Sequence, residues 1–163
     1  MSAAIRVGLI SDTHGVLRSE ATAFLSGCSL ILHGGDIGGG AILEELEKIA
    51  PLTTVRGNND RGPWAQHLNE TELVSVGEVV VYLIHNVAHL RDKPLAAGIR
   101  VVMSGHSHQP MIEQRGGILF VNPGSAGPRR FKLPVAAGEL MVSESGVAAR
   151  IVDLVSGRTL AKS

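Results

Sequence analysis

Short apolar runs rich in valine, isoleucine and leucine recur along the chain, and each run ends at a turn that carries glycine or polar residues. The five clearest segments are IRVGLISDTHG (5–15), SLILHGGD (29–36), LTTVRGNND (52–60), VVVYLIHN (79–86) and IRVVMSGHSH (99–108). Apolar runs of about six residues are typical of strands that are buried on both faces, as in the sheets of layered α/β proteins. The pattern therefore predicts an α/β fold with several such strands.

Helical spacing occurs between these strands. In residues 41–50, Ile42, Leu46 and Ile49 fall on one stripe, most charged residues lie elsewhere, and Pro51 ends the helix. Residues 18–27 show a weaker helical pattern. The segments GGILFVN (116–122), AAGELMVS (136–143) and GVAARIVDL (146–154) alternate instead, so the last third of the chain is predicted to be mostly β. No repeat, low-complexity tract or linker divides the sequence, and we expect a single domain over residues 1–163.

The composition excludes several kinds of partner. The 163 residues contain 15 Lys or Arg and 15 Asp or Glu, so no excess charge is available to bind nucleic acid or an anionic membrane surface. The longest apolar run, VVVYLI at 79–84, is too short to span a bilayer, and we find no signal-peptide pattern. Cys28 is the only cysteine and cannot form an internal disulfide. We expect a soluble cytoplasmic protein with no strong affinity for nucleic acid and no membrane attachment.

Residue types that bind metals gather at the ends of the predicted strands. Asp and His lie two apart after the first strand, and two His lie two apart after the fifth, a spacing that lets extended backbone point both side chains the same way. Because the carboxyl ends of strands in an open α/β sheet meet at one edge, these loops should converge. The candidate ligands brought there are Asp12, His14, Asp36, Asn58, His85, His106 and His108.

Each of these motifs also has a simpler interpretation. A D-x-H after a strand is commonly a capped turn, GNND suits a turn, and a histidine that ends a strand is commonly a hydrogen-bonded core residue. HGGDIGGG (33–40) lacks the Gly-Lys-Ser/Thr ending of a nucleotide-binding loop. The GHSH pair is the most informative, because two imidazoles two residues apart make a poor core and a good chelate. The occurrence of all five motifs in order, each at a strand end, favours a metal site.

The order D-x-H, G-D, G-N-x-D, a strand-ending H and G-H-x-H resembles the signature of the calcineurin-like metallophosphoesterases. The short length and NPGS at 122–125 resemble most closely their small YfcE-like phosphodiesterase branch, which is related to a eukaryotic retromer subunit. The resemblance implies a four-layer αββα sandwich, in which two mixed sheets are flanked by helices and two metal ions lie at one edge of the stacked sheets.

The same resemblance implies a role for each ligand. Asp12, His14, Asp36 and His108 would hold the first metal, and Asp36, Asn58, His85 and His106 the second, with the Asp36 carboxylate bridging the two ions. The nucleophile would be a hydroxide held by the metals and not a side chain. A set of nitrogen and oxygen donors without thiolate suits Mn²⁺, Fe, Co, Ni or Zn²⁺, and Mn²⁺ is the ion that we expect first. Two such ions clamp phosphoryl oxygens during an in-line displacement.

Three positions near the ligands affect the chemistry. Much of the family has His after the Gly-Asn pair, as a general acid or phosphate contact, where this chain has Asn59, which cannot donate an acid proton at neutral pH. Relatives commonly have Gly after the strand-ending histidine, where this chain has Asn86. Asp60 is interpreted as a carboxylate that orients a ligand histidine, with a turn cap or a pair with Arg61 as the alternatives.

The remaining polar candidates are given no catalytic role. His33, His67 and His89 have no partner visible in the sequence and are interpreted as structural or surface residues. The basic cluster at 129–132 is interpreted as a solvated loop, with a contact to substrate phosphate as the minority alternative.

Taken together, the sequence favours a metal-dependent phosphodiesterase that hydrolyses a small diester or nucleotide-like compound. One alternative is a metal-binding but catalytically silent interaction module, as the retromer resemblance implies. That relative has lost ligand histidines, whereas this chain keeps His14, His85, His106 and His108. The other alternative is a phosphomonoesterase, which would share every ligand. The expected partner is a small phosphoester, and self-association is left open.

Overall fold

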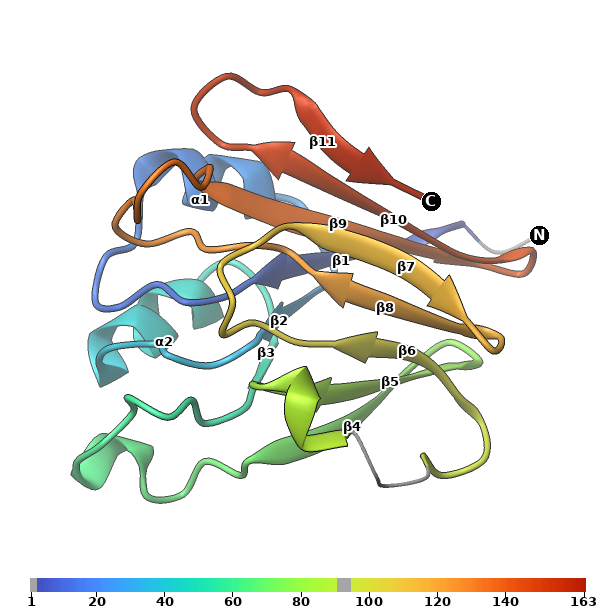
Figure 1. Cartoon of the computed structure of the whole chain (residues 1–163), viewed down its shortest axis with the longest axis horizontal. Helices are drawn as coiled ribbons and strands as arrows, with labels where there is room; N and C mark the ends of the chain where they lie inside the picture. The colour runs from blue at the N-terminus through green and yellow to red at the C-terminus, as the bar shows by residue number, and fades with distance from the viewer. Residues whose placement is uncertain (1–2, 91–94) are drawn as a thin grey trace.

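Two mixed β-sheets form most of the computed structural model, which describes residues 3–90 and 95–163 (Figure 1). Sheet A has the strand order β11-β10-β9-β1-β2-β3, with β1 Ile5–Ile10, β2 Leu30–His33, β3 Leu52–Thr54, β9 Ala136–Ser143, β10 Gly146–Asp153 and β11 Thr159–Lys162. Sheet B has the order β4-β5-β6-β8-β7, with β4 Thr71–Val76, β5 Val79–Ile84, β6 Ile99–Met103, β7 Met111–Arg115 and β8 Ile118–Asn122. The expectation of an α/β fold with two mixed sheets is confirmed.

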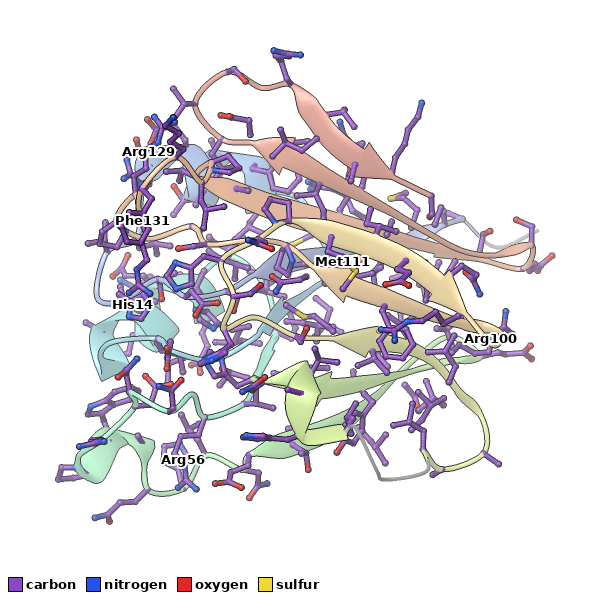
Figure 2. The ribbon with its side chains drawn as sticks, viewed as in Figure 1. His14, Arg56, Arg100, Met111, Arg129 and Phe131 are labelled. Atoms are coloured by element: carbon purple, nitrogen blue, oxygen red, sulfur yellow. The ribbon has the colours of Figure 1, made fainter. Side chains whose placement is uncertain are left out.

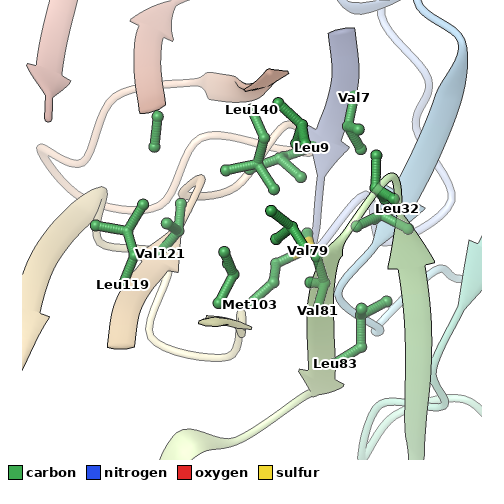
Figure 3. Packing of buried hydrophobic residues seen from close by; sticks show 14 of the residues in the cluster. Val7, Leu9, Leu32, Val79, Val81, Leu83, Met103, Leu119, Val121 and Leu140 are labelled. Carbon is green, nitrogen blue, oxygen red and sulfur yellow. The ribbon is translucent and has the colours of Figure 1, made fainter. Parts of the chain in front are cut away.

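The main core lies between the two sheets (Figure 3). Val7 and Leu9 of β1 point into it from sheet A, and Val81, Met103 and Val121 point into it from sheet B. Successive side chains of a strand face opposite sides, so the intervening residues of β1 face the outer layer of sheet A. Burial on both faces explains why this segment is apolar without interruption.

Two α-helices cover the outer face of sheet A, namely α1 (Ser19–Leu25) and α2 (Gly40–Glu47). Both helices are shorter than predicted: α1 lies within the predicted range 18–27, and α2 begins one residue before the predicted range 41–50 and ends three residues earlier. The chain leaves α2 in a tight turn, where the Ile49 N–H donates to the Leu46 carbonyl at 3.0 Å. Within the described residues, no helix is long and apolar enough to cross a membrane.

The outer face of sheet B carries much less helix than the resemblance implies. In the described part of the chain, its cover is the single-turn 3₁₀-helix η2 (Val87–Leu90), whose Val87 and Leu90 pack on the apolar cluster around Val102. These two residues are three apart, which is the spacing that a 3₁₀ turn places on one face. The four-layer arrangement is therefore present as two sheets, one layer of α-helices and, among the described residues, one short turn on the far side.

The parallel strands bring their carboxyl ends to one edge of the molecule. β1, β2 and β3 are parallel neighbours in sheet A, and β5, β6 and β8 are parallel neighbours in sheet B. In Figure 1 the strands β1, β6 and β8 all run toward the left of the view. The loops that follow these strands therefore meet at the left edge, where the sequence predicts the metal site.

Candidate metal centre

All seven candidate ligands come from loops that follow strands and gather at this edge. Figure 2 shows His14 and Arg56 there, and Arg100, near the start of β6, at the opposite end of the molecule. The loops supply Asp12 and His14 after β1, Asp36 after β2, Asn58 after β3, His85 after β5, and His106 and His108 after β6.

One group of ligand atoms consists of Asp12, His14 and His108. The Nε2 atoms of the two histidines are 3.3 Å apart. The Oδ1 atom of Asp12 lies 3.4 Å from Nε2 of His108 and 3.8 Å from Nε2 of His14. One carboxylate oxygen and two imidazole nitrogens thus face a common point.

A second group consists of Asp12, Asp36 and His85, so Asp12 belongs to both groups. Oδ2 of Asp36 lies 3.4 Å from Nε2 of His85 and 3.8 Å from Nε2 of His14, and it therefore sits between the two groups. Asn58 extends the second group, because its Oδ1 is 3.0 Å from Nε2 of His85. The same Asn58 oxygen is 3.2 Å from Nδ1 of His106. Two Asp/His clusters that share Asp12, with Asp36 between them, suggest a binuclear metal site.

The hydrogen bonding of the ligands fits a cation. Among the described residues, the two buried side-chain polar atoms without a hydrogen-bond partner are Oδ1 of Asp12 and Nδ1 of His108, and both belong to candidate ligands. Nδ1 of His85 lies 2.7 Å from the Gly34 carbonyl, which can only accept, so this nitrogen carries a proton. In the neutral ring the free lone pair is then on Nε2, which faces the oxygens of Asp36 and Asn58. A buried carboxylate oxygen without a donor, beside imidazole nitrogens that present lone pairs, fits a positive ion.

The pKa shifts of Asp36 and His85 also favour a bound cation. Burial acts to raise the pKa of Asp36, but hydrogen bonds from His85 and Asn59 hold the pKa of this carboxyl well below its usual range. Burial acts to lower the pKa of His85, but the hydrogen bond to Asp36 and the charge of Asp12 raise it above the usual value. The carboxylates that stabilise a proton on His85 would also stabilise a divalent cation.

The backbone of the ligands is strained. Six non-glycine residues of the described chain have φ in the left-handed region, and five of them are candidate ligands: Asp12 (55°), His14 (47°), Asp36 (55°), His106 (70°) and His108 (62°). Each such conformation has a cost, and it persists only where the surroundings enforce it. Here neighbouring loops bind each other's backbone: the N–H of Asp12 donates to the Gly35 carbonyl, and that of His14 donates to the Asp36 carbonyl, both at 3.0 Å. Strain of this kind is typical of functional sites.

Comparison with known proteins agrees with the geometry. A model of the calcineurin-like phosphoesterase superfamily domain matches residues 5–144. A relative from Methanothermobacter thermautotrophicus, named a probable metallophosphoesterase, is 40% identical over 131 residues, which are 73% of this chain and 76% of the relative. The chain belongs to the calcineurin-like phosphoesterase superfamily. The small YfcE-like resemblance proposed from the strand-end motifs is confirmed by these matches and by the structural likeness described next.

Other proteins are similar to this chain at lower sequence identity. A phosphodiesterase of Methanocaldococcus jannaschii is 24% identical over 138 residues, 74% of this chain and 83% of that protein. The solved structure of Yfce, a phosphoesterase from E. coli, has a TM-score of 0.75 at 24% identity, with 98% of each chain covered. The structure of Vps29 from Entamoeba histolytica in complex with Zn²⁺ has a TM-score of 0.76 at 23% identity and the same coverage.

In this superfamily member, Asn59 contacts the carboxylate that joins the two groups. Its backbone N–H donates to Oδ1 of Asp36 at 2.9 Å, and its side-chain Nδ2 donates to Oδ2 of Asp36 at 2.9 Å. Both carboxylate oxygens are thus held by one residue. Asn59 therefore fixes the orientation of Asp36 in addition to occupying the position where much of the family has His.

Asp60 holds two ligand loops together through backbone groups. Its Oδ1 accepts from the N–H groups of Ile37 and Gly38 at 2.8 and 3.1 Å, and its Oδ2 accepts from the N–H of Gly57 at 2.8 Å. No histidine is among these partners, so the contacts are those of the turn cap that was the alternative interpretation. Gly57 must be glycine here, because a Cβ at this position would overlap the backbone and carboxylate of Asp36.

Several supporting residues are visible only in the structure. The Ser11 hydroxyl donates to Oδ2 of Asp12 at 2.6 Å, and the Ser125 hydroxyl donates to the Asp12 carbonyl at 2.9 Å. Asn122 donates from Nδ2 to the Gly105 carbonyl at 2.9 Å, next to the two histidines of the last loop. The sequence signal for these residues is the presence of small polar side chains inside strand-end motifs such as LISDTH and FVNPGS, which are otherwise apolar on their strand side.

His33 is a buried link between the first two ligand loops. Its Nδ1 accepts from the Gly35 N–H at 3.0 Å, so Nε2 carries the proton and donates to Oγ1 of Thr13 at 3.0 Å. The Thr13 hydroxyl in turn donates to the Ile37 carbonyl at 2.7 Å. Burial lowers the pKa of His33 from 6.5 to about 4, so the ring is neutral in the folded protein at neutral pH. The interpretation of His33 as structural agrees with these contacts.

We expect His33 to make the metal-free protein less stable as the pH falls from about 6.5 to about 4. The unfolded chain binds a proton at His33 in this range and the folded chain does not, so protonation favours unfolding. The stability difference should reach about 3 kcal/mol at the lower pH. Urea unfolding in the presence of a chelator, from pH 4.5 to 7.5, should give a smaller loss for His33→Gln, whose amide does not titrate. Identical pH slopes for the two proteins would contradict the assignment.

Proposed function

We propose that the protein is a metal-dependent phosphodiesterase that hydrolyses small phosphodiesters or nucleotide-like compounds. The observation that carries the proposal is the convergence of seven candidate nitrogen and oxygen ligands at one edge, where the buried Oδ1 of Asp12 has no hydrogen-bond partner. Two relatives support it by name, one as a probable metallophosphoesterase and the other as a phosphodiesterase. The likeness to Vps29 concerns the fold, and no observation on this chain favours a silent interaction module.

The candidate ligands divide between two ions. Asp12, His14, Asp36 and His108 would hold one, and Asp36, Asn58, His85 and His106 would hold the other, with Asp36 shared. Divalent ions bound there supply Lewis acid chemistry, which stabilises charge on phosphoryl oxygens and activates water. The donor set suits Mn²⁺, Fe, Co, Ni or Zn²⁺, and we propose Mn²⁺.

The residues around the candidate ligands hold the ligand loops in position, and Asn59 does not act as a general acid. Asp60 and His33 fix the ligand loops, and Asn59 holds the Asp36 carboxylate. The Asn59 amide can donate a hydrogen bond to an oxygen but cannot transfer a proton at neutral pH. The site therefore favours substrates whose leaving oxygen departs without protonation, such as aryl phosphodiesters.

The proposal is tested by an activity screen of the purified protein. After treatment with a chelator, the protein should regain hydrolysis of bis(4-nitrophenyl) phosphate on addition of Mn²⁺ or a related divalent ion. Hydrolysis of 4-nitrophenyl phosphate, a monoester, should be slower with every metal. A faster monoester reaction would replace the proposal by the phosphomonoesterase alternative. Tight metal binding without turnover of either ester would favour the interaction module.

A further inference from the structure

A cavity of about 420 Å³ opens directly beside the second ligand group. Three candidate ligands, Asn58, His85 and His106, form one of its walls. The volume falls within the range of small-molecule sites, roughly 300 to 1,000 Å³, and exceeds what a phosphoryl group alone would fill. A substrate bound at the ligands would therefore place its remaining part in this cavity.

Another part of the cavity lining is apolar and aromatic. Tyr82 and Ile84 alternate with the core residues of β5 and so face the outer side of sheet B, and Leu90 reaches the cavity from η2. All three belong to the apolar cluster on that side of the sheet, which keeps the wall in place. Tyr82 is half-buried, so part of its surface remains accessible. A wall of this kind binds a flat, uncharged group better than a second phosphate.

The charged residues at the cavity cancel. Arg56 lies directly before the Gly57-Asn58 turn, and its Nη2 is 3.4 Å from Oε1 of Glu70, with the two side chains 35% and 80% exposed. Figure 2 shows Arg56 at the same end of the molecule as His14. One cation and one anion leave the rim without excess positive charge for a polyphosphate. Their polar groups can still bind the edge of a ring that carries hydrogen-bonding atoms.

We propose that this cavity binds the ester group that stays on the phosphate when it is an aryl or nucleobase-like ring, with Tyr82 as its aromatic wall and the Arg56–Glu70 pair at its polar rim. The assignment rests on the proposed phosphodiesterase function and specifies its substrate: a phosphodiester whose non-leaving ester group is aromatic. Tyr82 would then determine specificity without taking part in metal binding.

Two substrates with the same leaving group test the assignment. Bis(4-nitrophenyl) phosphate and methyl 4-nitrophenyl phosphate both release 4-nitrophenolate, and only the first has a second aromatic group, which stays on the phosphate and can occupy the cavity. Tyr82→Ala should lower the ratio of their kcat/KM values by about threefold to tenfold, mainly through KM of the first substrate. Tyr82→Phe should keep the wild-type ratio.

Phe120→Ala is the matched control, because Phe120 is another aromatic residue on the outer face of sheet B and lines a separate hollow. It should leave the ratio unchanged. A ratio that Tyr82→Ala does not alter, or that Phe120→Ala alters equally, would overturn the assignment.

A binding measurement separates the cavity from catalysis. Isothermal titration calorimetry of the Mn²⁺-loaded protein should give tighter binding of phenylphosphonate than of methylphosphonate, and Tyr82→Ala should remove most of this difference. Neither compound needs to be hydrolysed. If the wild type shows the phenyl preference but no diesterase activity, the cavity assignment stands and the proposed function fails. If it hydrolyses diesters but binds both phosphonates equally, the function stands and the cavity assignment fails.

Discussion

Replacing Asp36 by Ala is expected to remove both metal ions and to lower kcat/KM for an aryl phosphodiester by more than about 10³-fold. The effect should be this large because mutating a residue that only supports a metal ligand already costs roughly 10- to 100-fold in metal affinity or activity. Oδ2 of Asp36 lies 3.4 Å from His85 Nε2 and 3.8 Å from His14 Nε2, so it faces a candidate ligand of each group. The variant also leaves two Asn59 donors without their acceptor. Elemental analysis of protein grown with Mn²⁺ should fall from two metals per chain toward none.

Asp153→Asn provides the control for Asp36→Ala. Asp153 is a half-buried carboxylate at the end of β10, where it accepts from the N–H groups of Val155 and Ser156 in the following turn. This variant should keep both metals and full activity. Circular dichroism of the two variants should match the wild type, so that loss of metal is not mistaken for loss of fold. A full metal complement in folded Asp36→Ala would remove the shared-ligand role from Asp36.

The convergence of the candidate ligands could be predicted because it depends on two regularities of sequence and fold. Each candidate lies in the turn after an apolar run, and the carboxyl ends of parallel strands meet at one edge. Side chains two apart, such as His106 and His108, then reach the same site. The left-handed backbone at these residues could not be predicted, because it is imposed by hydrogen bonds between loops distant in sequence, such as that from Asp12 to Gly35.

The contacts of the residues next to the candidate ligands could not be predicted from the local sequence pattern. Asp60 and Asn59 both bind groups 23 residues away, in the loop after β2, and only the packing of the two loops decides which atoms meet. The same holds for the cavity, which joins Arg56, before a ligand turn, to Tyr82 on another strand. The sequence shows Tyr82 merely as one position of an apolar run.

Two edge strands have weak sequence patterns for a physical reason. β4 (Thr71–Val76) alternates between exposed and partly buried residues at the edge of sheet B, so it lacks the continuous apolar run that marked the central strands. β11 (Thr159–Lys162) has four residues, three of them exposed, at the edge of sheet A. Edge strands need only one apolar face or none, and their sequences carry correspondingly little information.

The second large expected effect concerns how strongly the hydrolysis rate depends on the leaving group, and it follows from Asn59. In an in-line displacement the departing oxygen needs either a proton or a low pKa, and a positioned acid typically accelerates the reaction by roughly 10²- to 10⁴-fold. The Asn59 amide donates to Asp36 and supplies no acid proton. The wild-type rate should therefore fall steeply as the pKa of the leaving group rises, and aryl phosphodiesters should react faster than alkyl diesters.

Replacing Asn59 by His should restore the rate selectively for poor leaving groups. Nδ1 of the new ring takes nearly the position of the present Nδ2, so it can still donate to the Asp36 carboxylate, which also favours the protonated ring. The Nε2 proton is then available to the departing oxygen. The gain should approach about 10²-fold for poor leaving groups and be near zero for 4-nitrophenolate.

The decisive measurement is the dependence of log kcat/KM on leaving-group pKa across a series of methyl aryl phosphodiesters. In this series the methyl group stays on the phosphate throughout, so the contribution of the cavity is constant. The wild type should show the steeper slope, and Asn59→His the shallower one. Asn59→Ala serves as the control, because it removes the side-chain hydrogen bond to Asp36 without providing an acid, and it should lower all rates while keeping the steep slope. Two results would contradict this interpretation: equal slopes for the wild type and Asn59→His, or a monoester as the best substrate of the wild type. Either result would show that another group protonates the leaving oxygen, and the phosphomonoesterase alternative would then come first.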